Sequence, residues 1–142
     1  MEQFLRQPLP TFRAVLLHGP DNGLVRERSR ILVQAAAGMP PDPFQVSDIS
    51  ASETRKDSAL LIDEAATFPL TGGCKVVRLT DVTEQDCKTL KAFLITPLDN
   101  VLVLAEAGEL RGKSMLKRLF EEADDAASIA CYQDMTNTIS HF

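Results

Sequence analysis

The sequence predicts an α/β domain in three layers, in which helices flank a mainly parallel, five-stranded sheet. Apolar runs of strand length alternate along the chain with segments of helical period, which is the pattern of strand and helix units around a parallel sheet. Clusters of glycine, proline, aspartate and asparagine separate these segments. The length of 142 residues, with 44% hydrophobic and 25% charged residues, is that of one globular domain with a single core.

The first strand and helix surround a turn. Residues 14–18 form an apolar run that ends at 19–23, a cluster of turn-forming residues. A helix is predicted at 24–37, because apolar residues recur there with helical period and Gly38 ends the segment. Its apolar stripe consists of Leu24, Ile31, Leu32 and Ala35.

The second unit ends at a proline and two glycines. Residues 44–47 are predicted as a strand and 57–66 as a helix. The apolar face of this helix consists of Leu61, Ile62 and Ala65. The helix ends near Pro69, because a proline disfavours helical conformation in the residue before it. The paired glycines then favour a turn, after which 74–79 is predicted as the third strand.

Two further helices and two strands complete the predicted sheet. A helix at 84–94 leads to a strand at 100–105, and a helix at 112–122 leads to a strand at 127–131. The inward-facing residues are Cys87, Leu90, Phe93 and Leu94 in the first helix and Met115, Leu116, Leu119 and Phe120 in the second.

Residues 1–133 are expected to form the domain. The nine residues 134–142 are polar and close no recognisable unit, so they are interpreted as the start of a linker to a following domain. The isolated chain is expected to be a monomer. Because no apolar run approaches 18 residues and no signal-peptide pattern is present, we expect a cytoplasmic protein without a membrane contact.

The charge balance disfavours direct DNA binding. Fifteen Lys and Arg against 20 Asp and Glu give a net charge of −5, whereas nucleic-acid-binding domains normally carry a basic excess. The helix at 112–122 is locally basic, but the acidic residues at 121–125 partly cancel that charge. We therefore expect DNA to be contacted only indirectly or weakly.

Cysteines and histidines indicate neither a metal site nor a catalytic site. His18 and His141 have no nucleophile or carboxylate at a catalytic spacing, and His18 is interpreted as a strand end. Asp81 follows a strand, where an acidic residue can orient magnesium, but a helix cap or a solvated loop residue is favoured there. Cys74 enters a strand next to Lys75, and it is interpreted as a small hydrophobe rather than a reactive thiol. The three cysteines are widely spaced and odd in number, which disfavours a disulfide or zinc framework. They are Cys74, Cys87 and Cys131.

The turn at 19–23 has the position of a phosphate-binding loop without its chemistry. Such a loop has four residues between its glycines and then Lys and Ser or Thr, whereas only three residues separate Gly19 from Gly23. Leu24 and Val25 occupy the places of the lysine and the hydroxyl. Asp21 sets a negative charge where phosphate would lie and is well placed to cap the helix. A structural turn is therefore favoured.

The stretch 65–73 is the strongest candidate for a partner contact. It carries Phe68 and Leu70 beside a proline and two glycines at the end of a predicted helix. If both side chains point inward, they form a buried corner between helix and strand. If one or both point outward, they form an apolar knob of the kind that fills a pocket on a partner.

Three segments resemble the N-terminal domain of the delta subunit of the bacterial DNA polymerase III clamp loader. They are residues 16–27, the stretch from 63–66 through 72–79, and 101–104 with 116–120. The resemblance covers nearly the whole chain. It implies an AAA+-like (P-loop NTPase-type) fold with a degenerate nucleotide site formed by Gly19, Asp21 and Gly23. It also implies no cofactor and no enzyme activity in this domain, within a parent complex that is a DNA polymerase III holoenzyme.

The resemblance also implies a partner, the ring-shaped sliding clamp, which domains of this family bind and help to open. The family makes this contact with a small residue, a Leu or Met, and a Phe before the third strand. By position these correspond to Pro69, Leu70 and Thr71. Thr71 stands where the family has an aromatic residue. If the anchor begins earlier in this chain, Phe68 supplies that aromatic ring. Other clamp-loader subunits are the second class of partner.

Two alternatives remain open at this stage. An active P-loop nucleotide-binding domain is disfavoured by the missing Lys and Ser or Thr after Gly23. A scaffold within the loader that does not touch the clamp is compatible with the same sequence. A CheY-like or Rossmann-type domain lacks its acidic cluster or its glycine pattern here.

Overall fold

The computed structural model describes residues 12–37, 45–67, 74–98, 100–110 and 112–131. Five strands form one sheet in which every recorded pairing is parallel, in the order β2-β3-β4-β1-β5. The strands are β1 (Ala14–His18), β2 (Val46–Ser50), β3 (Lys75–Val82), β4 (Val101–Ala107) and β5 (Ala126–Ala130). The predicted five-stranded parallel sheet is confirmed.

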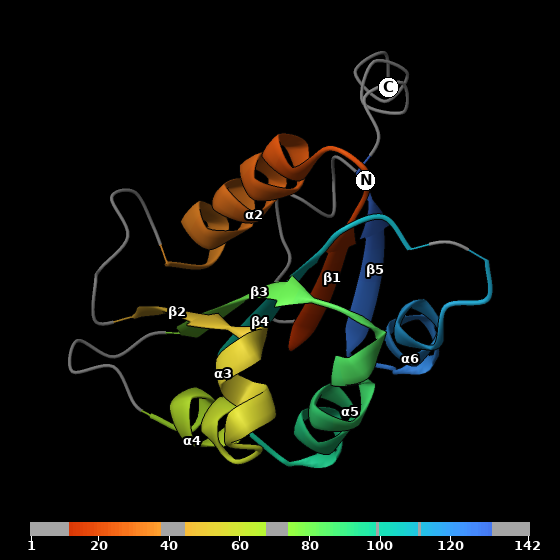
Figure 1. The fold of residues 1–142 in the computed structure, drawn as a ribbon. Coiled ribbons are helices and arrows are strands. Elements are labelled where there is room, and N and C mark those ends of the chain that lie inside the picture. Colours follow the sequence, from red (N-terminus) through yellow and green to blue (C-terminus); the bar gives the residue numbers. More distant parts are fainter. Residues whose placement is uncertain (1–11, 38–44, 68–73, 99, 111, 132–142) are drawn as a thin grey trace.

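Helices cover both faces of the sheet, which gives the three predicted layers (Figure 1). Helix α2 (Asn22–Ala37) lies on one face. The other face carries α3 (Ala51–Lys56), α4 (Leu60–Ala65), the short helical turn η1 (Glu84–Asp86), α5 (Cys87–Ile95) and α6 (Met115–Glu122). Buried residues form a cluster on each face, with Leu32 of α2 in one and Phe93 and Phe120 in the other.

The second strand and the helix after it differ from the sequence prediction. Strand β2 runs from Val46 to Ser50 rather than over 44–47. Helix α3 follows at once, where the sequence had been interpreted as a connection. Ser50 accepts a hydrogen bond from the Ser52 N–H (3.2 Å), and Glu53 Oε2 accepts one from the Ser50 N–H (2.9 Å). This capping box satisfies the free N–H groups of the first turn and starts the helix.

Helix α2 buries the predicted stripe only in part, since Leu32 is buried and Leu24 packs against the core as predicted, but Ile31 and Ala35 do not. Its fully buried residues are Val25, Ser29, Leu32 and Val33. Ala35 of the predicted stripe is exposed, and Ile31 is only half-buried. The buried face of α2 also contains a polar residue, Ser29, which an apolar pattern does not reveal. Ser29 accepts a hydrogen bond from Arg78 Nε (3.3 Å).

Helices α4 and α6 begin later than predicted, α4 without a side-chain hydrogen bond from its cap residue Ala59, whereas the helix predicted from residue 84 begins there as the turn η1 that runs into α5. Helix α4 starts at Leu60 rather than 57, and α5 at Cys87 after a short turn that Thr83 caps. Helix α6 starts at Met115 rather than 112, because Ser114 accepts a hydrogen bond from the Lys117 N–H (3.1 Å). Met115 is consequently 68% exposed and not inward-facing as predicted. The other inward predictions for α5 and α6 are confirmed as buried or packed against the core.

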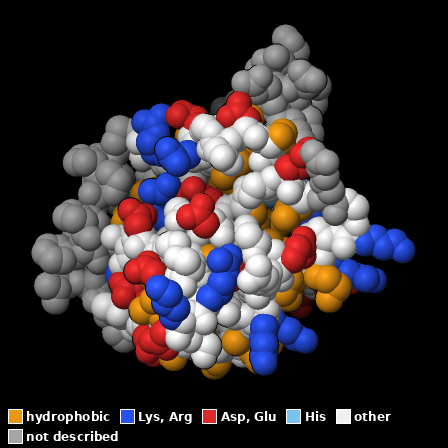
Figure 2. All heavy atoms as spheres, in the orientation of Figure 1, with side chains coloured by type: hydrophobic (Ala, Val, Ile, Leu, Met, Phe, Trp, Pro, Cys, Tyr) orange, Lys and Arg blue, Asp and Glu red, His pale blue; other side chains and the backbone are white. Residues whose placement is uncertain are grey.

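Acidic and basic side chains are interspersed on the face of the molecule that Figure 2 shows. Ion pairs account for part of this pattern, including Arg30 with Glu27 (2.8 Å) on α2 and Arg118 with Glu122 (3.1 Å) on α6. Both pairs are exposed, so they contribute little to stability.

Candidate functional site

The turn between β1 and α2 lies beside an open pocket at the carboxyl ends of the central strands. In open α/β sheets ligands bind at this edge. The pocket has a volume of about 240 Å³. It is lined by Asn22, Val25 and Arg26 of α2, Thr80 and Asp81 of β3, and Glu106, Ala107 and Gly108 at the end of β4. The structure therefore places the predicted loop where a nucleotide site would be.

Gly19 serves a close contact with the neighbouring backbone. Its N–H donates a hydrogen bond to the Gly108 carbonyl (3.3 Å). A Cβ atom at Gly19 would lie 2.1 Å from the Cys131 carbonyl oxygen, which is far inside van der Waals contact. The adjoining Cys131 N–H donates to the His18 carbonyl (2.6 Å). The need for a glycine here is explained by the approach of the chain after β5.

Asp21 caps helix α2, as the sequence predicts. Its Oδ1 accepts a hydrogen bond from the Leu24 N–H (3.1 Å), and its carbonyl accepts one from the Val25 N–H (3.1 Å). Gly23 lies exposed in the first turn of the helix. The N–H groups of Leu24 and Val25 at this helix terminus are thus bonded within the chain, and a carboxylate already occupies the position that attracts anions.

The two residues after Gly23 face the core. Val25 is 3% exposed and belongs to the apolar cluster between α2 and the sheet, and Leu24 packs against the same cluster. Neither side chain can supply the ammonium and hydroxyl groups that a nucleotide loop provides at these positions.

Two carboxylates line the pocket. Glu106 is buried, and its Oε2 accepts hydrogen bonds from Arg78 Nη2 (2.9 Å) and Nε (3.1 Å). Arg78 Nη1 also pairs with Asp48 (3.3 Å), so its charge is divided between two acids. Asp81 is exposed and has a left-handed backbone (φ 58°), where the pairing of β3 with β4 is irregular. The solvated position of Asp81 agrees with the favoured interpretation of the sequence.

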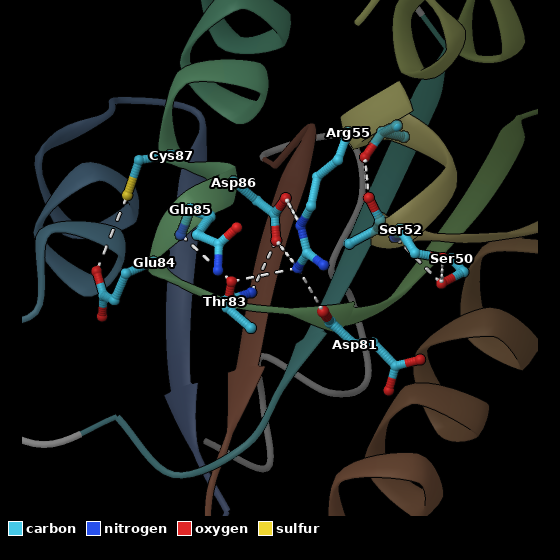
Figure 3. A network of polar contacts seen from close by, with 11 residues as sticks. Ser50, Ser52, Arg55, Asp81, Thr83, Glu84, Gln85, Asp86 and Cys87 are labelled. Atoms are coloured by element: carbon cyan, nitrogen blue, oxygen red, sulfur yellow. Dashed lines mark hydrogen bonds and ion pairs between the residues drawn. The ribbon is translucent and has the colours of Figure 1, made fainter. Parts of the chain in front are cut away.

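A network around Arg55 fixes the chain just beyond Asp81 (Figure 3). Arg55 donates to both Asp86 oxygens, from Nε (3.0 Å) and Nη2 (2.8 Å), and from Nη2 to the Asp81 carbonyl (3.1 Å). Asp86 is 1% exposed and also accepts from the Thr83 N–H (2.8 Å). The hydrogen bond to Asp86 raises the pKa of Arg55 above its ordinary value. The sequence interpretation missed this network because it missed α3.

The predicted clamp anchor, Phe68, Pro69, Leu70 and Thr71, lies outside the described residues. The structure describes both sides of it, with α4 ending at Ala65 and β3 beginning at Lys75. These two sides are joined by an ion pair between Lys75 Nζ and Glu64 Oε1 (3.2 Å). Lys75 Nζ also donates to Ser47 Oγ (2.8 Å) on β2.

His18 ends β1, as predicted, and is a buried titratable group. It is 3% exposed, and among the described residues its Nδ1 has no hydrogen-bond partner. Burial lowers the pKa of His18, the nearby charge of Lys117 lowers it further, and Glu121 opposes both effects.

We predict that His18 makes the fold less stable as the pH falls below about 6.5, the ordinary histidine value. Because the pKa is lowered in the folded state, the unfolded chain binds the proton first and stability falls. The slope has a limit of about 1.4 kcal/mol per pH unit for one group. Urea unfolding of wild type and His18→Leu at pH 8, 6.5 and 5.5 measures it. Equal pH dependence in the two proteins would contradict the prediction.

The cysteines are in environments that suppress reactivity. Burial raises the pKa of Cys74 and of Cys131 to about 11, and it also raises that of Cys87. These thiols stay protonated near neutral pH, which agrees with the interpretation of Cys74 as a small hydrophobe. Over the described ranges, no group of three or more His, Cys, Asp or Glu side chains is arranged to hold a metal ion. None of the described helices is long and apolar enough to span a membrane.

The sheet order and the loop after β1 define the class of the fold. A parallel five-stranded sheet in the order β2-β3-β4-β1-β5, with helices on both faces and a turn after β1, is the α/β fold that this chain shares with a P-loop NTPase domain of known structure. The predicted fold class is confirmed.

Solved structures with the same fold include a DNA clamp loader delta protein and a DNA polymerase III gamma subunit-related protein. The Bacillus subtilis DNA clamp loader delta protein matches with a TM-score of 0.70 and 16% identity, over 98% of this chain and 44% of that one. A DNA polymerase III gamma subunit-related protein from Thermotoga maritima matches with a TM-score of 0.58 and 15% identity, over 99% of this chain and 48% of that one. The chain therefore spans less than half the length of either protein.

A third solved structure with the same fold is a P-loop NTPase domain. The P-loop NTPase domain of the sigma-54 transport activator from Escherichia coli matches with a TM-score of 0.53 and 18% identity, over 92% of this chain and 90% of that one. No family model matches the sequence, and no curated protein matches it. At identities of 15–18% these matches establish a shared fold.

Proposed function

We propose that this chain is a clamp-loader domain of the delta type, which binds the DNA polymerase sliding clamp and helps to open the ring during replication. The observation that carries the proposal is the likeness to a DNA clamp loader delta protein over 98% of the chain. The three sequence segments that resemble the delta family also support it. They lie in β1 and α2, in α4 and β3, and in β4 and α6. Other clamp-loader subunits are its further partners.

The proposed domain does not hydrolyse ATP. The residues of the loop after β1 make contacts within the fold. Gly19 bonds to the neighbouring backbone, Asp21 caps α2, and Val25 is buried in the core. Three charged residues line the adjoining pocket. Glu106 and Arg78 are paired with each other, so neither offers a free charge, and the exposed Asp81 offsets the positive charge of Arg26 toward a polyphosphate. ATP then acts in other subunits and controls access to the clamp-binding segment.

The proposed contact is the apolar segment 68–71, which combines an aromatic and an aliphatic residue with a proline. Large apolar side chains that enter a pocket dominate the energetics of many interfaces. Binding alone also accounts for ring opening, because a protein that binds the open edge more tightly than the closed one shifts the ring toward opening. The proposed domain therefore needs no covalent chemistry.

The test of this function is ring opening by the chain without ATP. A clamp labelled with a fluorophore and a quencher on either side of one subunit interface reports the open fraction. We expect the chain to raise that fraction, and to raise it equally with and without ATP. A chain that binds the clamp but leaves the open fraction unchanged would contradict the opening step, and an effect that requires ATP would favour an active P-loop domain.

A further inference from the structure

Ser47, Glu64 and Lys75 form a polar triad on the sheet face opposite α2. Lys75 Nζ lies 2.8 Å from Ser47 Oγ and 3.2 Å from Glu64 Oε1, and Ser47 Oγ donates to the same Glu64 oxygen (2.5 Å). The three residues come from β2, α4 and β3. Each polar group in the triad is therefore satisfied by the other two.

Lys75 is unusually buried for a lysine, with its side chain 6% exposed. Taking an ammonium group out of water is costly, and the neighbouring carboxylate and hydroxyl offset that cost. The adjacent β3 residues Val76 and Val77 are fully buried apolar side chains, and an apolar residue at position 75 would avoid the cost altogether. A buried ion pair is weak evidence for stability, so the triad calls for another explanation.

The placement of the triad suggests that explanation. Glu64 is in the last turn of α4, and Lys75 is the first residue of β3. Their ion pair therefore joins the two sides of the connection that carries residues 68–71. Ser47 ties both sides to β2, where its neighbour Val46 is in register with Val76 of β3.

We propose that the Ser47–Glu64–Lys75 triad is a positioning device for the clamp-binding segment. This inference rests on the proposed function, which it deepens by naming residues that act through the anchor and not in contact with the clamp. Fixing the two ends of a connection reduces the conformational freedom that it must lose on binding. The triad thus increases clamp affinity by organising the segment before the clamp is met.

The most informative variant is Lys75→Met, which removes the charge and keeps the length of an apolar stem. It leaves no deeply buried charge behind, because the Glu64 side chain is 33% exposed and can be hydrated. Arg13→Met is the matched control. Arg13 pairs with Asp125, whose side chain is 36% exposed, and packs over Phe93 of α5. It also donates to the carbonyl oxygens of Leu94, Thr96 and Leu98, so its loss removes at least as many contacts as the loss of Lys75 does. The exchange Glu64→Lys/Lys75→Glu restores an ion pair with reversed polarity.

Clamp binding is measured by surface plasmon resonance at a temperature where circular dichroism shows each variant to be folded. We expect Lys75→Met to raise the Kd about tenfold, Arg13→Met to change it by less than about twofold, and the exchanged pair to return toward wild type. A folded Lys75→Met that binds like wild type, or an equal loss in Arg13→Met, would overturn the inference.

A second readout separates this inference from the proposed function. Thermolysin cleavage within residues 66–74 under native conditions reports how firmly the ends of the connection are held, with no clamp present. We expect Lys75→Met to be cleaved about ten times faster than Arg13→Met. If wild type does not bind the clamp, the proposed function fails and this comparison still decides the role of the triad. Equal cleavage rates in the two variants would overturn it.

Discussion

Replacing Gly19 by alanine should destabilise the fold by about 3 kcal/mol or more, the upper end of what overpacking costs. The added methyl group would lie 2.1 Å from the Cys131 carbonyl oxygen. This oxygen belongs to the backbone, so no side-chain rotation can relieve the clash. Relief requires β1 and β5 to separate at their carboxyl ends, where the Cys131 N–H is bonded to the His18 carbonyl. Urea or thermal unfolding followed by circular dichroism measures the loss.

Gly108→Ala is the control for this substitution. Gly108 is also a neighbour of Gly19, since its carbonyl accepts a hydrogen bond from the Gly19 N–H, but nothing lies within 4 Å of a Cβ built there. Its substitution should change stability by less than about 1 kcal/mol. If Gly19→Ala is as stable as Gly108→Ala, the glycine is not explained by the approach of the β5 backbone.

Leu70→Ala should weaken clamp binding by at least about 30-fold, which corresponds to about 2 kcal/mol, the lower limit for a residue that dominates an interface. The expectation rests on the proposed anchor, in which Leu70 fills an apolar pocket on the clamp. Surface plasmon resonance over immobilised clamp measures the change. Because the substitution is expected to act on binding, the thermal unfolding of the free chain should change little.

Met115→Ala is the control for the loss of an apolar residue elsewhere on the surface. Met115 is 68% exposed and belongs to α6, which packs against β1 and β5 at the opposite end of the sheet from β2 and β3. Its substitution should leave the clamp Kd unchanged. Phe68→Ala in the same series fixes the register of the anchor. Equal affinities for wild type and Leu70→Ala would remove Leu70 from the proposed contact.

Strands β1, β3 and β4 were predictable because each buries an apolar run that local patterns reveal, whereas β2 was placed too early because only Ile49 of its five residues is buried. Strand β1 has the predicted bounds, since all five of its residues are buried. Helix faces were harder to predict where a polar residue is buried, as Ser29 is in α2. The apolar period alone then assigns part of the stripe wrongly, because the hydrogen bond from Arg78 that satisfies Ser29 comes from a strand 49 residues later.

Helix α3 was missed although its signal was present in the sequence. Ser50 and Glu53 have the spacing of a capping box, but no apolar stripe follows them. Of its six residues only Ala51 and Thr54 are buried, so hydrophobic periodicity gives no indication of a helix. A search for caps as well as for periodicity would have found it, and with it the position of Arg55.

The candidate site was predictable in part. The missing Lys and Ser or Thr after Gly23 can be read directly from residue types at fixed spacing, and the cap that Asp21 forms was predicted from its position. The polar triad and the Arg55 network do not follow from it, because Lys75 and Ser47 are 28 residues apart and Arg55 and Asp86 are 31. Such contacts depend on which strands become neighbours, and β2 and β3 are paired only once the sheet has formed.

The binding of the wild-type chain to the sliding clamp of the same organism, without nucleotide, tests the central proposal most directly. Surface plasmon resonance over immobilised clamp should show saturable binding that ATP does not alter. A chain that is folded by circular dichroism and yet gives no binding would contradict the proposal and leave a scaffolding role within the loader as the better account.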